Sequence, residues 1–157
     1  YAPTEKCPWR KKVLQGEVHD DNTWAFGGVS THAGLFGELK DVAAWGLYLR
    51  QSLRHSMGSP LATQKTARLF CRRQFPAAVG DWGLGFMMRS SKDSTAGRYF
   101  SKRSVGHTGF TGTSLWYDPV KDLLITILSN RVHPTRDNQN FKSLRPALHD
   151  WTAEFLR

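Results

Sequence analysis

The residues best suited to chemistry lie between Ser104 and Pro119, where a histidine and several hydroxyl side chains alternate with glycines. The imidazole of His107 can gain or lose a proton near neutral pH. The hydroxyls of Thr108 and Thr111 can bind a polar substrate. Three glycines recur at every third position of this stretch, and glycine in a strand often permits close approach to the backbone. The stretch therefore predicts one wall of an active site, with room for a ligand beside the glycines.

Antiparallel strands are expected to carry this wall. Residues 82–89 alternate between apolar and other side chains, which is typical of a strand with one buried face. A second strand is predicted over 104–109 and on to 117, and a third over 123–129, joined by a turn at Asp118-Pro119. The segment 82–130 is thus expected to form a meander of three strands.

Helices are predicted on both sides of this meander. Apolar residues recur at helical spacing over 39–55, and Ser59-Pro60 resembles the start of a second, shorter helix; together they make 38–76 a helical region. The same spacing predicts a C-terminal helix over 143–156, with Pro146 in its first turn. The expected fold class is α+β, an antiparallel sheet of three or more strands with flanking helices.

Residues 1–37 are rich in proline and glycine and are expected to be mostly loop. Within them His19-Asp20-Asp21-Asn22 could bind a metal, or could form a turn in which Asp and Asn bond their own backbone. The turn is favoured because neighbours on a loop seldom converge on one ion. Cys7 and Cys71 have neither metal nor redox spacing and are expected to be free thiols. We therefore predict no metal and no cofactor.

The size of the chain, 157 residues, is that of one domain. No apolar run approaches the roughly 20 residues of a membrane span. The net charge of +9 suits a polyanion, but the basic residues are scattered and form no recognition helix, so nucleic acid is not the expected partner. The sequence opens at Tyr1, without a recognisable export signal. We expect a piece of a longer protein, and assign no compartment.

Gly106-His107-Thr108-Gly109, followed by a hairpin that ends in Ser129-Asn130, resembles the third motif of the serine β-lactamase and penicillin-binding-protein superfamily. The resemblance is to its class C β-lactamases, D-alanyl-D-alanine peptidases and esterases. Gly27-Gly28-Val29-Ser30-Thr31, with Asp41 opening a helix, is similar to another segment of that group, and Gly83-Leu84-Gly85-Phe86 to the strand before the third motif. The order and spacing of these pieces carry the resemblance from about residue 16 onward.

The resemblance implies acyl-enzyme chemistry, in which a serine attacks a carbonyl, a lysine or tyrosine moves the proton and water deacylates the enzyme. His107 and Thr108 would face the substrate's carboxylate or the general-base network, and Gly109 would keep the strand surface clear. The backbone N–H of Phe110 would belong to the oxyanion hole, where one donor is worth roughly 3–4 kcal/mol. The remaining predicted substrate-binding residues are Thr111 and Gly112.

Two motifs of the family are absent. No lysine has a serine three positions before it, and no asparagine has a serine or tyrosine two positions before it. Both motifs lie upstream in the family, so we expect residues 1–157 to be a C-terminal fragment that lacks the nucleophile and is inactive alone. β-Lactams, D-alanyl peptides and small esters are the substrate classes of the parent, and the motifs do not select among them.

The missing N-terminal elements would leave strand 123–129 with an unpaired edge, which invites pairing with another chain. The expected partner is the N-terminal part of the same protein, or a second copy. Two other functions stay open: a non-catalytic binding or regulatory homologue, and a nucleic-acid-binding domain that rests on charge alone.

Overall fold

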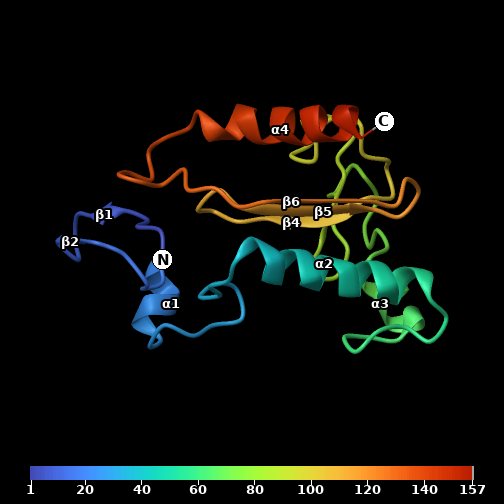
Figure 1. Ribbon diagram of the computed structural model, residues 1–157, viewed down its shortest axis with the longest axis horizontal. Coiled ribbons are helices and arrows are strands. Elements are labelled where there is room, and N and C mark those ends of the chain that lie inside the picture. The colour runs from blue at the N-terminus through green and yellow to red at the C-terminus, as the bar shows by residue number, and fades with distance from the viewer. Residues whose placement is uncertain (157) are drawn as a thin grey trace.

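A four-stranded antiparallel sheet separates two helical layers (Figure 1). Across the sheet the strands follow the order β3 (Met87–Met88), β4 (Val105–Thr108), β5 (Ser114–Asp118) and β6 (Leu123–Ile127). Helix α2 (Leu39–Arg54), on which α3 (Gln64–Phe70) packs, covers one face, and α4 (Phe141–Phe155) covers the other. The computed structural model describes residues 1–156. The predicted α+β class, with helices flanking an antiparallel sheet, is confirmed.

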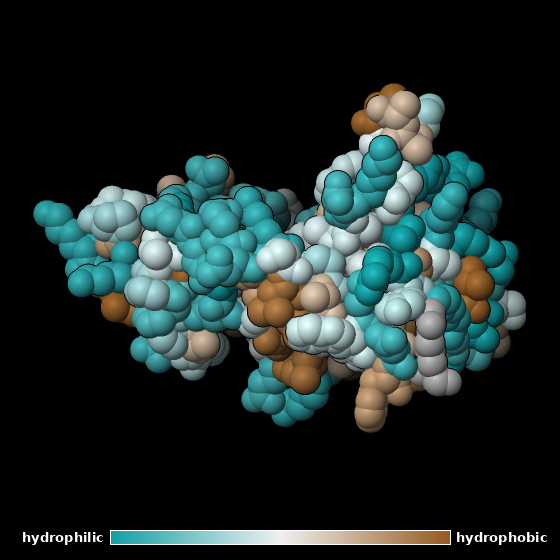
Figure 2. Space-filling view, turned by 90° about the horizontal axis from the view of Figure 1, so that it is seen from above, coloured by the Kyte–Doolittle hydropathy of each residue, from teal (hydrophilic) through white to brown (hydrophobic). Residues whose placement is uncertain are grey.

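The first part of the chain forms a smaller lobe beside these layers. It contains the two-residue strands β1 (Lys6–Cys7) and β2 (Lys12–Val13) and the short helix α1 (Asp21–Ala25). In Figure 2 this lobe is set apart from the larger one by a constriction, next to which apolar residues gather. The loop-rich character predicted for 1–37 agrees with these short elements.

Strand β5 is the centre of the core, since every residue in it is buried. On the face toward α4, Trp116 is fully buried and clusters with Phe100 and Ala153. On the face toward α2, Val105 of β4 clusters with Leu49. The period-two alternation of the strands therefore supplies two apolar layers, one for each helix.

The chain reverses within the segment predicted to be one strand over 104–117. Gly112 has a φ of +120°, and its N–H donates to the Gly109 carbonyl at 3.1 Å, which closes a tight turn between β4 and β5. The prediction of a continuous strand was therefore wrong. A signal was present, because glycine tolerates positive φ where other residues do not.

The strand predicted over 82–89 is also shorter than expected. Only Met87–Met88 pair with β4, and Trp82 forms an isolated bridge to Met87. Between them Gly85 has a φ of +75°, and the Gly83 N–H donates to the Phe86 carbonyl at 2.9 Å, so the chain turns back on itself. Alternating apolar residues here belong to a turn rather than to one strand face.

Helix boundaries agree with the sequence where the apolar pattern is long. Helix α2 occupies nearly the predicted range, whereas the second helix begins at Gln64 rather than at Ser59-Pro60, because the Thr63 hydroxyl caps it. Helix α4 begins at Phe141, which places Pro146 in its second turn rather than its first.

Both cysteines are buried and free, as predicted. No helix within residues 1–156 combines the length and apolar character that crossing a bilayer requires.

Candidate active site

The outer edge of β4 is open where the predicted site begins. Strand β3 pairs only with the first half of β4, in the register Met88↔Val105 and Met87↔Gly106. Within the described residues no strand lies beside His107 and Thr108 on that side. Because backbone groups alternate in direction along a strand, those of Thr108 face this open side, whereas those of His107 face Leu115 of β5. The Thr108 backbone is thus available to an extended ligand, as at other unpaired strand edges.

His107 is exposed at this edge, and its ring lies against Trp82 with centroids 5.8 Å apart. Its Nδ1 lies 2.9 Å from the carbonyl oxygen of Thr108. Because a carbonyl only accepts hydrogen bonds, Nδ1 carries the proton in this contact. In the neutral ring Nε2 is therefore unprotonated, so it can accept a proton or a hydrogen bond from a ligand.

Thr108 shares the edge with His107 but not its face, because successive side chains of a strand point to opposite faces. His107 pairs in register with Leu115 on the α2 side, and Thr108 with Ser114 on the α4 side. The Thr108 hydroxyl is half-buried, 3.8 Å from the sulfur of Met87. The structure thus brings the two predicted residues to one edge and separates their side chains.

The turn after β4 presents two neighbouring N–H groups. The Gly109 N–H donates to the Thr113 carbonyl at 2.8 Å, and the Gly112 N–H donates to the Gly109 carbonyl. In the part of the chain that the structure describes, the N–H groups of Phe110 and Thr111 donate to no other group. Free backbone N–H groups of this kind can donate to an oxyanion.

The glycines of this stretch have a different role from the one predicted. A Cβ on Gly106 would lie 2.2 Å from the Leu115 carbonyl oxygen, and one on Gly109 would lie 2.1 Å from the Thr113 hydroxyl. A Cβ on Gly112 would lie 2.6 Å from the Ser129 hydroxyl. The space beside each glycine is filled by the chain itself. Internal packing, and not room for a ligand, accounts for these glycines.

Two arginines that sequence reasoning missed hold the turn from behind. Arg145 of α4 donates from Nη2 to the Gly109 carbonyl at 3.0 Å. Arg131 donates from Nε to the Phe110 carbonyl at 2.7 Å, and its guanidinium lies 4.4 Å from the centre of the Phe110 ring. In a basic chain these arginines resemble surface residues. Only the position of Arg145 on the apolar side of a helix could have revealed it.

Within the polar stretch His19–Asn22, the side chains of His19 and Asp20 contact different partners. Asp20 caps α1 by accepting from the Thr23 N–H at 2.8 Å, as the predicted turn requires. His19 is buried, stacks 5.6 Å from the Phe110 ring and lies 3.1 Å from the carboxylate of Glu5. Burial lowers the pKa of His19. This histidine therefore supports the turn after β4 from the N-terminal lobe.

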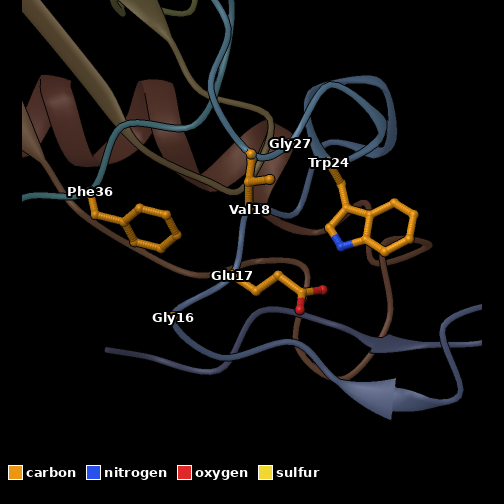
Figure 3. Close-up of a pocket in the computed structure, with 7 residues that line it drawn as sticks. Gly16, Glu17, Val18, Trp24, Gly27 and Phe36 are labelled. Atoms are coloured by element: carbon orange, nitrogen blue, oxygen red, sulfur yellow. The ribbon is translucent and has the colours of Figure 1, made fainter.

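A hollow of about 570 Å³ lies in the N-terminal lobe (Figure 3). Trp24 and Phe36 stand on opposite sides of it, and the Glu17 side chain lies between them. Hydrogen bonds to Lys12, the largest effect, and to Arg10 lower the pKa of Glu17. None of the six residues predicted for the site lines this hollow, so it is separate from the β4 edge.

Comparison with known proteins assigns this chain, with its antiparallel sheet between helices and the open edge of β4, to a family. The Beta-lactamase family model matches residues 1–148. The chain belongs to that family.

The chain is also similar to individual proteins of known name or structure. The chain is 40% identical over 130 residues to a protein of Salmonella gallinarum named as a D-alanyl-D-alanine carboxypeptidase, and 39% identical to one of Salmonella agona with the same name. The match covers 79% of this chain, and it spans only 29% of the length of each relative. A crystal structure of a β-lactamase from Mycobacterium bovis superposes with a TM-score of 0.59 at 28% identity, covering 78% of this chain and 45% of that one.

Proposed function

We propose that this chain is the C-terminal part of a serine hydrolase that acts through an acyl-enzyme, on a D-alanyl peptide, a β-lactam or a small ester. The observation that carries the proposal is the junction of β4 and its turn. There an exposed histidine with a bare Nε2 adjoins two N–H groups that have no acceptor within residues 1–156. The names of the relatives add the D-alanyl peptides as the first substrate class to test.

The substrate would lie along the open edge of β4 as an added strand. Its scissile carbonyl would then reach the turn, where the Phe110 N–H would stabilise the charge that develops on oxygen. His107 and Thr108 would bind the substrate's polar groups or move protons, and Thr111 and Gly112 would bound the far end of the site. The exposed Phe110 ring, 59% accessible, offers an apolar surface to the acyl group.

The nucleophile would come from another part of the protein, because no lysine of this chain follows a serine by three positions. The match spans 29% of the relatives' length, which leaves ample chain for it. We further propose that strand β6, whose only neighbour among the described strands is β5, accepts a strand from that remaining part. A second copy of this chain is the alternative occupant.

The experiment is covalent labelling of the full-length protein with a fluorescent penicillin and with a fluorophosphonate, followed by mass spectrometry. We expect a stoichiometric adduct on a serine outside residues 1–157, an acyl group from the opened penicillin ring or a phosphonyl group from the fluorophosphonate with loss of fluoride, and no labelling of residues 1–157 produced alone. Labelling of residues 1–157 would contradict their inactivity. Absence of labelling of the full-length protein by both probes would favour a non-catalytic binding or regulatory homologue.

A further inference from the structure

Two buried arginines lie behind the turn that follows β4. Arg131 is 8% exposed and Arg145 is 9% exposed. In the part of the chain that the structure describes, neither guanidinium forms an ion pair with a carboxylate. Each guanidinium stays protonated because arginine is not deprotonated in proteins. Burying two such charges without anions is costly, so an offsetting role for them is expected.

Backbone carbonyls take the place of anions here. Arg131 donates to the carbonyls of Phe110, Arg136 and Asn138 at 2.7, 3.0 and 2.9 Å. Arg145 donates to the carbonyl of Gly109 at 3.0 Å. Burial, and after it the nearby charge of Arg131, lower the pKa of Arg145, which agrees with two cations close together. Both cations thus meet at the successive peptide units of one turn.

The geometry of a peptide unit links these contacts to the other side of the turn. A trans peptide is planar, and its C=O and N–H point in opposite directions. The Gly109 carbonyl and the Phe110 N–H belong to one such unit, so fixing the carbonyl toward Arg145 fixes the N–H away from it. A charged donor on the carbonyl also polarises the unit and strengthens its N–H as a donor.

We propose that Arg145 is a positioning residue for the oxyanion hole: its guanidinium holds the Gly109–Phe110 peptide so that the Phe110 N–H faces the reacting carbonyl. Arg131 does the same for the next unit, whose N–H belongs to Thr111. This role rests on the proposed function, since it presupposes an oxyanion at Phe110. Neither arginine touches the substrate; each acts through the backbone that it holds.

The test compares an oxygen ester with the thionoester of the same acyl group, in which sulfur replaces the carbonyl oxygen. Sulfur is the weaker hydrogen-bond acceptor, so stabilisation by the oxyanion hole favours the oxygen ester. The readout is the ratio of kcat/KM for the two esters, measured on full-length protein. Because both esters meet the same enzyme, the ratio does not depend on how much of a variant is folded.

We expect Arg145→Met to lower this ratio by about 10-fold, which is less than removal of a whole oxyanion donor, with most of the change in kcat. Lys142→Met removes a positive charge from an exposed position of the same helix and should leave the ratio unchanged. Should the Met variant not accumulate, Arg145→Lys tests the same contact, because an ammonium lacks the planar fork of arginine.

Equal losses on both esters, or no loss, in an active protein would overturn the role of Arg145 and leave the proposed function standing. A wild-type enzyme that is active but shows no preference for the oxygen ester would overturn it as well. Full-length protein that turns over neither ester would refute the proposed function and the positioning role together.

Discussion

The Glu5 carboxylate and the Arg136 guanidinium form a bidentate pair between residues 131 positions apart, with Nε–Oε1 and Nη2–Oε2 distances of 2.9 and 2.6 Å. Glu5 is 3% exposed, and its hydrogen bonds to Arg136 hold its pKa at about 2. The pair fastens the N-terminal lobe to the loop that precedes α4. Since His19 of that lobe contacts both Glu5 and the Phe110 ring, the fastening extends to the candidate site.

Glu5→Gln is expected to lower the free energy of unfolding by about 2–3 kcal/mol, because it leaves a partly buried guanidinium without its main anion. Urea denaturation at pH 7 followed by tryptophan fluorescence measures the change. Glu154→Gln is the control, since Glu154 is exposed on α4 and should change stability by less than about 0.5 kcal/mol. Equal effects of the two variants would show that the pair does not stabilise the fold.

The burial of His149 leads us to expect that the protein loses stability in mild acid. This histidine is fully buried on α4, 3.0 Å from the Ser114 hydroxyl. Burial, and next the cation of Arg145, lower its pKa to about 4, against a smaller opposite effect of Asp150. Unfolded chains titrate this group near 6.5. Between about pH 6.5 and 4 the unfolded state therefore binds one more proton than the folded state. As the pH is lowered through this range, the free energy of unfolding decreases by up to about 3 kcal/mol.

The measurement is urea unfolding from pH 7.5 to 4 for the wild type and His149→Gln, which keeps a hydrogen-bonding partner for Ser114 but does not titrate. Glu5 and Asp122, with pKa values held at about 2 by arginine hydrogen bonds, affect both proteins alike. The variant should show a flatter profile in this window. Parallel profiles would refute the assignment to His149.

Gly112→Ala should destabilise the protein strongly, by about 2–4 kcal/mol. The backbone at Gly112 has a φ of +120°, and a Cβ there would lie 3.0 Å from the backbone nitrogen of Arg131, which cannot move aside freely. Gly27→Ala is the matched control, because its φ is +88° but nothing lies within 4 Å of the added atom. It should cost about 1–2 kcal/mol from strain alone. Thermal unfolding of the two variants distinguishes the cost of backbone strain, which both share, from the cost of the steric clash, which only Gly112→Ala has.

The apolar pattern was sufficient to predict the helices and the class of the fold, but not the strands around the site. Helix α2 has a long periodic pattern, so its bounds could be predicted closely. The turn at Gly109–Gly112 was missed because its flanking residues have strand propensity, and only the backbone conformation of Gly112 separates the two strands. Local sequence carries this information weakly.

Within the candidate site, His107 and Phe110 could be predicted because they lie together in one motif. Arg131 and Arg145 could not, since they reach the turn from distant parts of the chain. Their burial is a tertiary property. The role predicted for the glycines was wrong for a related cause: the groups beside them belong to β5, to the turn before it and to the segment after β6, and only the folded structure brings these groups close.

His107→Ala should reduce the rate of labelling of the full-length protein by on the order of 100-fold, the usual contribution of a group that moves a proton. Its exposure predicts little change in stability. His55→Ala, an exposed histidine at the end of α2, is the control and should label at the wild-type rate. Stopped-flow labelling gives the rates. Equal rates for both variants would exclude His107 from the chemistry.

Strand β6 predicts a difference in amide exchange between the full-length protein and residues 1–157 alone. If the remaining chain pairs with this edge, the amides of Leu123–Ile127 that do not bond to β5 should be protected only in the full-length protein. Hydrogen exchange with mass spectrometry measures the protection, and size-exclusion chromatography shows whether the separate chain dimerises instead. A separate chain that is monomeric, with β6 exchange identical to the full-length protein, would contradict both partners.

The fastening of the N-terminal lobe has a consequence for synthesis on the ribosome. The partners of that lobe are synthesised late, because they lie about 130 residues further along the chain. They include the Pro134 carbonyl, which accepts from the Lys6 N–H, and the Arg136 side chain, which binds Glu5. At about 5–20 residues per second, the first strands wait on the order of ten seconds for them. During that time the lobe has no docking surface, and chaperones have their longest access to it.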